Sequence, residues 1–426
     1  MSILLFDSDQ KQGIAPYAYG LIYMISALIA SYSIWKIYYR VKHPFWSTQP
    51  VFHYNSLRYW IAPPGIISFD ELPATKYYDP FHVSLYKSDK IPPSTQKDCV
   101  ELIQNHYLKD RDVHYDPPSK HILAHCNGHN GTCWWSIFHT TTVGVERKRQ
   151  SNVSEGQLAH NVIPLKRAVS CLMFRPTSAY LREKGSSQLK KMNYWYVDFL
   201  VTHKDHRGIG IAPKLIYTTC KSLINKERRA CLFKREGQQA PFVPLVRYVA
   251  YTYDIKYWKR VPSHTHYKLS LISVENFALC QRFLEEQRDN GSKLLFVCGD
   301  MSHIKELVVD GVYDIFLLHH KDSCIGCYVW RRSHMTCRGD PVMECVGSLV
   351  TKEAPNVWAS QWANVIDFLK NKRGIRYITI ENISDNKQAV AMLQPIKKCI
   401  SKTLMSYSLY NCALRPYLPK DTFILL

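Results

Sequence analysis

The stretch Asp198-Phe-Leu-Val-Thr-His-Lys-Asp-His-Arg-Gly-Ile-Gly-Ile-Ala-Pro213 gives the strongest indication of the fold of this chain. It begins as the end of a strand expected over residues 194–201, passes through Arg207-Gly-Ile-Gly210, and continues into a helix expected over residues 211–225. Glycines let consecutive backbone N–H groups curl inward, and a helix N-terminus adds partial positive charge, so this segment predicts a cradle for a phosphate or pyrophosphate. Pro213 suits the first turn of a helix, where its missing N–H costs nothing. A glycine turn that serves geometry alone is the alternative interpretation.

Around this stretch, segments with strand and helix patterns alternate along the chain. Further strands are expected over residues 168–174 and 377–380, and a helical stripe is formed by Trp358, Trp362, Val365, Ile366 and Leu369. Alternation of this kind favours an α/β class with a central sheet. A length of 426 residues suggests about two or three domains. We place the boundary between two halves near residues 259–266, a basic segment with Pro and Ser.

The composition is that of a globular protein, with 46% hydrophobic and 21% charged residues, which excludes wholesale disorder, collagen and coiled coil. Lys and Arg number 55 and Asp and Glu 35, which gives a formal net charge of +20. Such a chain attracts nucleic acid, phosphates of the CoA type or an anionic membrane face. The basic runs at residues 147–149 and 226–229 come with no recognisable nucleic-acid module, so we expect no nucleic-acid partner.

The 14 cysteines are scattered and do not form the dense pattern of a disulfide scaffold. One CxxC motif, Cys324 to Cys327, follows His319 and His320. A second group consists of His125, Cys126, His129 and Cys133. Neither group has a matching second pair at zinc-finger spacing, so we predict no metal site. Instead, residues 314–318 and 327–330 predict two strands joined by a turn at residues 322–326.

Near the N-terminus, residues 12–35 carry no formal charge and include the run LIYMISALIASYSIW. As a helix this segment is about 36 Å long, enough to cross a bilayer core of ~30 Å. Lys36, Arg40 and Lys42 follow it, and the positive-inside rule then leaves the large C-terminal part in the cytoplasm. A cleaved signal peptide would begin with a basic segment, whereas Asp7 and Asp9 lie there. We expect a membrane anchor with a helix over residues 14–37.

Four short motifs, in the same order, resemble those of the N-myristoyltransferases, a branch of the GNAT acyltransferase superfamily. They are Phe45-Trp-Ser-Thr-Gln-Pro50, the stretch from Phe199 to Pro213, Tyr257-Trp-Lys-Arg260, and Tyr407-Ser-Leu-Tyr-Asn411. The resemblance covers residues 43–426. It implies two tandem GNAT-like α/β halves related by a pseudo-twofold axis, with residues 43–262 binding acyl-CoA and residues 263–426 building the peptide-binding half. Residues 1–42 are left as the tail and anchor.

The resemblance also implies roles for individual residues. Backbone N–H groups of Phe199 and Leu200 would form an oxyanion hole, and the terminal carboxylate of Leu426 would be the general base. The apolar tail over residues 423–426 suits burial, and a desolvated carboxylate has a raised proton affinity. The acyl-CoA would contact Phe45, Trp46, Val201, Arg207, Gly208, Ile209, Gly210, Ile211, Ala212 and Pro213. The acceptor peptide would contact Asp110, Asp112, Tyr257 and Tyr410.

The sequence departs from the family pattern at several of these positions. Ile209 and Gly210 stand where the family has basic residues, and Asp198 stands where it usually has Asn. Lys109 and Arg111 interrupt the acidic peptide-binding loop. We therefore expect acyl-CoA as co-substrate, with no permanently bound cofactor, and N-terminal glycine proteins as acceptors for a monomeric, membrane-tethered myristoyltransferase. Two alternatives stay open: another acyl group or amine acceptor on the same fold, and a catalytically silent, membrane-bound adaptor.

Overall fold

The computed structural model describes residues 10–108, 113–146, 161–224, 227–237, 239–258, 266–351, 355–395 and 398–426. The chain divides into two compact units, residues 1–49 and residues 50–426. Each unit is described by itself below. The predicted boundary at residues 259–266 falls almost entirely outside the described residues, so the division into halves at that point stays a prediction.

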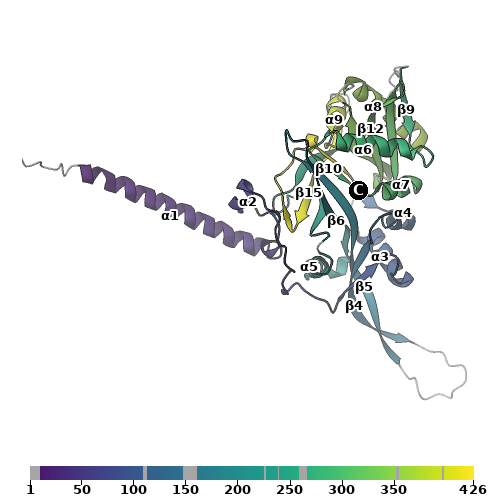
Figure 1. Ribbon diagram of the computed structural model, residues 1–426. Coiled ribbons are helices and arrows are strands. Elements are labelled where there is room, and N and C mark those ends of the chain that lie inside the picture. Colours follow the sequence, from purple (N-terminus) through teal and green to yellow (C-terminus); the bar gives the residue numbers. More distant parts are fainter. Residues whose placement is uncertain are drawn as a thin grey trace, which may run out of the picture. The chain divides into compact units, whose positions relative to one another are not determined.

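The N-terminal unit consists of one long helix followed by a short turn of 3-10 helix. Helix α1 (Gln10–Lys42) is drawn as a single unbroken helix in Figure 1, and it is longer than the predicted helix at both ends. Its part from Tyr19 to Lys42, with a mean hydropathy of 1.4, is long and apolar enough to cross a membrane. A signal sequence passes the same test of length and composition. The 3-10 turn η1 (Trp46–Thr48) follows, where the rings of Phe45 and Trp46 pack edge to face.

The large unit is an α/β structure, as predicted, and its described strands form a 15-stranded mixed sheet and a two-stranded one. The helices are α2 (Leu57–Ile61), α3 (Pro93–His106), α4 (Ser119–Ala124), α5 (Ile211–Leu223), α6 (Phe277–Asp289), α7 (Met301–Val309), α8 (Pro355–Arg373) and α9 (Asn386–Leu393). The strands of the first half are β1 (Gly65–Ile66), β2 (Val83–Lys87), β3 (Val113–Tyr115), β4 (Trp134–Glu146), β5 (Asn161–Arg182), β6 (Leu189–Thr202), β7 (Ala230–Glu236) and β8 (Val246–Asp254). Those of the second half are β9 (Tyr267–Leu271), β10 (Leu295–Cys298), β11 (Tyr313–His320), β12 (Ser323–Cys337), β13 (Asp340–Val350), β14 (Tyr377–Glu381), β15 (Cys399–Tyr410), β16 (Cys412–Ala413) and β17 (Thr422–Leu425).

The strand order of the large sheet shows the same motif twice. The order is β17-β10-β5-β6-β7-β15-β8-β14-β13-β12-β11-β9, with β4 and β2 continuing beside β5, and β3 beside β12. In the first half β6 and β7 are parallel neighbours joined through α5, and in the second half β13 and β14 are parallel neighbours joined through α8. A parallel pair needs such a crossover connection. The same strand–helix–strand unit therefore occurs twice in the large sheet.

In the first half, α3 and α5 cover opposite faces of the sheet. Side chains alternate between the faces along a strand. Trp135 of β4 therefore packs in the core cluster beneath α3, whereas its neighbour Ser136 exchanges a hydrogen bond with Thr219 of α5. In the second half, α6, α7, α8 and α9 gather around β9 to β14 (Figure 1). The helical stripe predicted there is confirmed for Trp362, Val365, Ile366 and Leu369 of α8, which are fully buried, whereas the side chain of Trp358 lies outside the part of the chain that the structure describes.

The C-terminal strand is built into the sheet. Strand β17 pairs in parallel with β10, which in turn pairs with β5. Phe423 has no exposed surface and Leu426 is 8% exposed, so the apolar tail is buried, as its composition suggested. One local prediction was wrong: β12 begins at Ser323, which leaves a turn at Lys321 and Asp322 instead of residues 322–326. Lys321 has a left-handed φ of 53°, which allows this tighter turn.

Candidate active site

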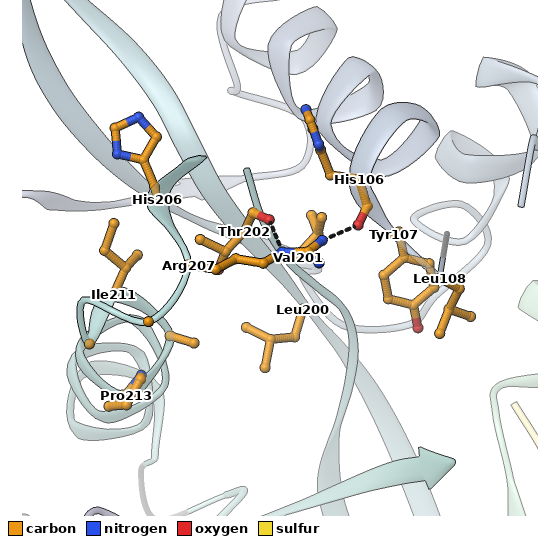
Figure 2. Close-up of a pocket in the computed structure, with 13 residues that line it drawn as sticks. His106, Tyr107, Leu108, Leu200, Val201, Thr202, His206, Arg207, Ile211 and Pro213 are labelled. Atoms are coloured by element: carbon orange, nitrogen blue, oxygen red, sulfur yellow. Dashed lines mark hydrogen bonds between the residues drawn. The ribbon is translucent and has the colours of Figure 1, made fainter. Parts of the chain in front are cut away.

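A cavity of about 550 Å³ lies where the end of α3, the end of β6 and the start of α5 meet (Figure 2). Its lining residues are His106, Tyr107, Leu108, Leu200, Val201, Thr202, His206, Arg207, Gly208, Gly210, Ile211, Ala212 and Pro213. All the cofactor-binding residues predicted between Val201 and Pro213, except Ile209, therefore line this cavity. The side chain of Ile209 is 68% exposed and is not part of the lining.

The glycine turn takes the conformation that the sequence suggested. Gly208 and Gly210 have φ values of 81° and 84°, in the left-handed region that other residues enter at a cost. Gly210 is the N-cap of α5, and Ile211 and Ala212 are its first residues. The first N–H groups of a helix have no intrahelical acceptor and carry partial positive charge. An anion in this cavity would therefore meet backbone donors at its α5 wall.

The guanidinium of Arg207 closes one side of the cavity. Its Nη2 donates to the carbonyl oxygen of His106 at 2.6 Å, and its Nε donates to that of Thr202 at 3.1 Å, as the dashed lines in Figure 2 show. These bonds tie the end of α3 to the end of β6. Lys214, one turn into α5, is likewise engaged, with its Nζ 3.0 Å from Asp79 Oδ2. Because the side chains of Arg207 and Lys214 are both bonded to other parts of the chain, we expect phosphate binding to depend mainly on the backbone N–H groups of the glycine turn.

Strand β6 bulges at the cavity wall. Asp198 pairs with Met173 and Val201 pairs with Cys171, so Phe199 and Leu200 lie opposite the single residue Leu172. A bulge of this kind locally disrupts the ladder and redirects side chains. Phe199 has a φ of 50° and packs in the cluster beneath α3, whereas Leu200 lines the cavity, between Ile211 and Tyr107 in Figure 2. The two residues predicted to form an oxyanion hole thus occupy the bulge.

The carboxylate of Asp198 engages one of these two amides. The Phe199 N–H donates to Asp198 Oδ1 at 2.8 Å, and Arg175 Nη2 donates to Asp198 Oδ2 at 3.0 Å. We refer to Arg175, Asp198 and the Phe199 amide as the carboxylate bridge. The sequence identified Asp198 only as a departure from the family pattern. It offered nothing that points to Arg175, which lies on the neighbouring strand, 23 positions earlier.

The predicted base, at Leu426, is buried in the core. The hydroxyl of Tyr313 donates to the terminal Leu426 O at 2.5 Å, and burial raises the pKa of Tyr313, so this hydroxyl keeps its proton at neutral pH. Leu426 packs in a core cluster with Tyr196 and Tyr407, while Phe199 belongs to the cluster beneath α3. The structure therefore buries Leu426 and Phe199 in different clusters and leaves Leu200, which lines the cavity, 38% exposed. Tyr313 was missed because nothing in its local sequence marks it.

Two buried ion pairs involve strands of the large sheet, and the one at Glu381 joins β7 to β14. Lys234 Nζ lies 2.7 Å from Glu381 Oε1, and Arg331 Nη2 lies 2.6 Å from Glu344 Oε2. The hydroxyl of Tyr248 donates to the other oxygen of Glu381 at 2.5 Å. Surrounding protein raises the pKa of Glu236 by desolvation, although its side chain reaches solvent.

The remaining predicted residues are scattered. Tyr257 is 75% exposed, whereas Tyr410 is 2% exposed within β15, so the two differ in how a peptide could reach them. Asp110 and Asp112 lie outside the described residues. Phe45 and Trp46 belong to the N-terminal unit. Among the described residues, no group of three or more His, Cys, Asp or Glu side chains is arranged to hold a metal ion.

No protein-family model matches the sequence, and a comparison with curated proteins finds no match. Solved structures do match. Two structures of Saccharomyces cerevisiae N-myristoyltransferase with bound myristoyl-CoA superpose with a TM-score of 0.63 at 12% identity, and cover 88–89% of this chain and 90–94% of theirs. The chain has the N-myristoyltransferase fold. A third structure of the yeast enzyme, with myristoyl-CoA and inhibitors, gives a TM-score of 0.62 at 13% identity, over 89% of this chain and 93% of the other.

Proposed function

We propose that this protein is an acyltransferase that moves a long acyl group, myristoyl in the first instance, from CoA to the N-terminal glycine of a protein. The observation that carries the proposal is the left-handed glycine turn that opens α5 beside the bulge of β6, within an N-myristoyltransferase fold. One cavity then adjoins two features that acyl transfer requires. The start of α5 has backbone N–H donors for the phosphates, and the bulge of β6 would receive the thioester carbonyl group.

The cavity suits the two ends of an acyl-CoA reactant. The pyrophosphate would lie against the N–H groups of Ile211 and Ala212, because a helix N-terminus favours negative charge. The thioester would lie against the bulge, where Leu200 lines the wall. The yeast structures with the same fold were obtained with myristoyl-CoA bound, which supports acyl-CoA as the co-substrate here.

The reaction needs a base, a nucleophile and a polarised carbonyl. The carboxylate of Leu426 would take one proton from the glycine ammonium, and the free amine would attack the thioester carbonyl carbon. The negative charge that develops on the carbonyl oxygen would be held by backbone N–H groups of the bulge. When the C–S bond breaks, CoA leaves as a thiolate, and it takes up the proton that the attacking nitrogen loses as the amide bond forms. Burial of the terminus favours the neutral acid over the carboxylate, which is the property a base requires.

A second candidate function is an adaptor that binds acyl-CoA without transferring the acyl group. The specific observation in its favour is the carboxylate bridge, because the Phe199 amide already has an acceptor. The two functions share the cavity and differ in turnover. Measurement of binding and transfer on the same sample therefore separates them.

The test is acyl transfer by the full chain in detergent. Myristoyl-CoA is added with a set of peptides that begin with glycine, and thiol release is followed together with the mass of the peptide. We expect a myristoyl mass on the N-terminal amine, and no product from matched peptides whose N-terminus is acetylated. Binding of myristoyl-CoA without product from any peptide would favour the adaptor. A chain that binds no acyl-CoA would contradict both candidate functions.

We also propose that α1 crosses a membrane and leaves residues 43–426 in the cytoplasm. Arg40 and Lys42 in its last turn support this orientation. The full chain is expected to stay in the membrane pellet through an alkaline wash, and a variant that lacks residues 1–42 is expected to be largely soluble. Cleavage of an added protease site after Lys42 is expected in sealed vesicles only when the protease is on the cytoplasmic side. Release of the full chain by the wash, or protection of that site, would contradict the anchor or its orientation.

A further inference from the structure

The carboxylate bridge uses both oxygens of Asp198. Oδ1 accepts from the Phe199 N–H at 2.8 Å, and Oδ2 accepts from Arg175 Nη2 at 3.0 Å. Hydrogen bonds that involve an ionised partner are roughly twice as strong as neutral ones. Both donors are therefore held firmly by one side chain. The Phe199 amide is also held in place by the left-handed backbone of the bulge.

Other buried side chains hold Arg175 in place, and Arg175 in turn restrains the carboxylate of Asp198. Its side chain is 3% exposed and lies over the ring of Tyr196, 4.9 Å from the ring centroid. Its Nη1 lies 3.0 Å from His303 Nε2, and His303 Nδ1 lies 2.7 Å from the carbonyl oxygen of Asn127. Burial lowers the pKa of His303 well below its usual range, which matches a neutral ring that donates through Nδ1 and accepts at Nε2. The ring of His129 stacks on His303 at 3.8 Å and adds to this support.

We propose that Asp198 is a positioning residue that sets the rate of transfer by keeping the Phe199 amide as its own hydrogen-bond donor. This inference rests on the proposed function. Because the Phe199 N–H is bonded to Asp198, only the Leu200 N–H would be left to polarise the thioester oxygen. The bulge would then supply one oxyanion donor instead of two. Loss of a single oxyanion donor typically slows an enzyme by about 10²–10³-fold. The protein would therefore be a slow transferase, and the carboxylate of Asp198 would limit its rate.

The substitution Asp198→Asn tests the bridge because an amide side chain has one oxygen. That oxygen can accept from Arg175 or from the Phe199 N–H, but it cannot serve both as the two carboxylate oxygens do. The charged guanidinium is the stronger donor, so we expect it to keep the oxygen and release the Phe199 amide. In the double variant Asp198→Asn/Arg175→Met, the guanidinium is gone and the oxygen returns to the amide. The double variant also avoids a buried arginine that lacks its carboxylate partner.

The first measurement follows the Phe199 amide directly and needs no activity. The full chain is labelled with ¹⁵N-phenylalanine, the Phe199 signal is assigned with Phe199→Tyr, and hydrogen exchange is measured. We expect at least tenfold faster exchange in Asp198→Asn, and a return toward the original rate in the double variant. Asp322→Asn, the same chemical change in the exposed turn between β11 and β12, is expected to leave the rate unchanged. Equal exchange in all four proteins would overturn the proposal.

The second measurement separates kcat from the affinity for myristoyl-CoA. Asp198→Asn is expected to raise kcat by 10- to 100-fold and to leave the Kd for myristoyl-CoA within about threefold, because the side chains of Asp198 and Arg175 do not line the cavity. A merely structural role for Asp198 would lower kcat, or would weaken binding as well, and either result would overturn the proposal. If no protein in the series binds myristoyl-CoA, the proposed function fails, whereas the exchange measurement still decides whether the bridge exists.

Discussion

Addition of a single glycine after Leu426 is expected to lower kcat for acyl transfer by about 10²–10⁴-fold, the usual contribution of a general base. The added residue moves the carboxylate away from the position that β17 and the hydroxyl of Tyr313 give it. It also replaces the terminal carboxylate of Leu426 with a peptide carbonyl, which is a far weaker base. Binding of myristoyl-CoA is expected to persist, since no residue of β17 lines the cavity.

The matched control is Leu426→Ile, which keeps the length of the chain and the volume of the buried side chain. We expect it to retain transfer within a few-fold, because volume-conserving exchanges are tolerated in cores. The extended variant must also keep its unfolding temperature within a few degrees, so that misfolding is excluded as the cause. Full activity in the extended variant would show that the base is another group.

The local part of the site could be predicted from the sequence because its residues are contiguous. The strand end, the glycine turn and the helix start between Asp198 and Pro213 follow one another along the chain, and each has its own backbone preference. The same holds for the burial of residues 423–426, which follows from their composition. These features depend on short-range chemistry, which a single sequence records.

The rest of the site depends on contacts between distant segments. Arg175 reaches Asp198 through the register of β5 and β6, and Tyr313 reaches Leu426 across 113 positions. His106 enters the cavity because Arg207 holds its carbonyl oxygen from 101 positions away. Arg175, Tyr313 and His106 carry no local pattern of their own. The same is true of the bulge. The sequence predicts the Phe199 N–H as an oxyanion donor, and only the geometry shows that this N–H is bonded to Asp198.

Substitution Ala212→Asp is expected to weaken binding of CoA by about 100-fold without loss of stability. Ala212 is the second residue of α5 and lines the cavity at the proposed phosphate site. A carboxylate about 5 Å from a phosphate charge costs ~3 kcal/mol at an effective dielectric constant of about 20. Every 1.4 kcal/mol corresponds to a tenfold change in affinity. The same carboxylate lies in the first turn of a helix, where negative charge is favourable by about 0.3–1 kcal/mol.

The control Ala212→Asn separates charge from size, because its side chain has nearly the same shape without the charge. We expect Asn to weaken CoA binding by less than tenfold, and the difference between the two variants to shrink as salt is raised, since salt screens exposed charges. Calorimetric titration with CoA gives the affinities, and thermal unfolding gives the stability. If Asp and Asn bind CoA equally well, the phosphates do not lie at the start of α5. The cavity would then hold some other part of the ligand, and the glycine turn would serve the geometry of the chain alone.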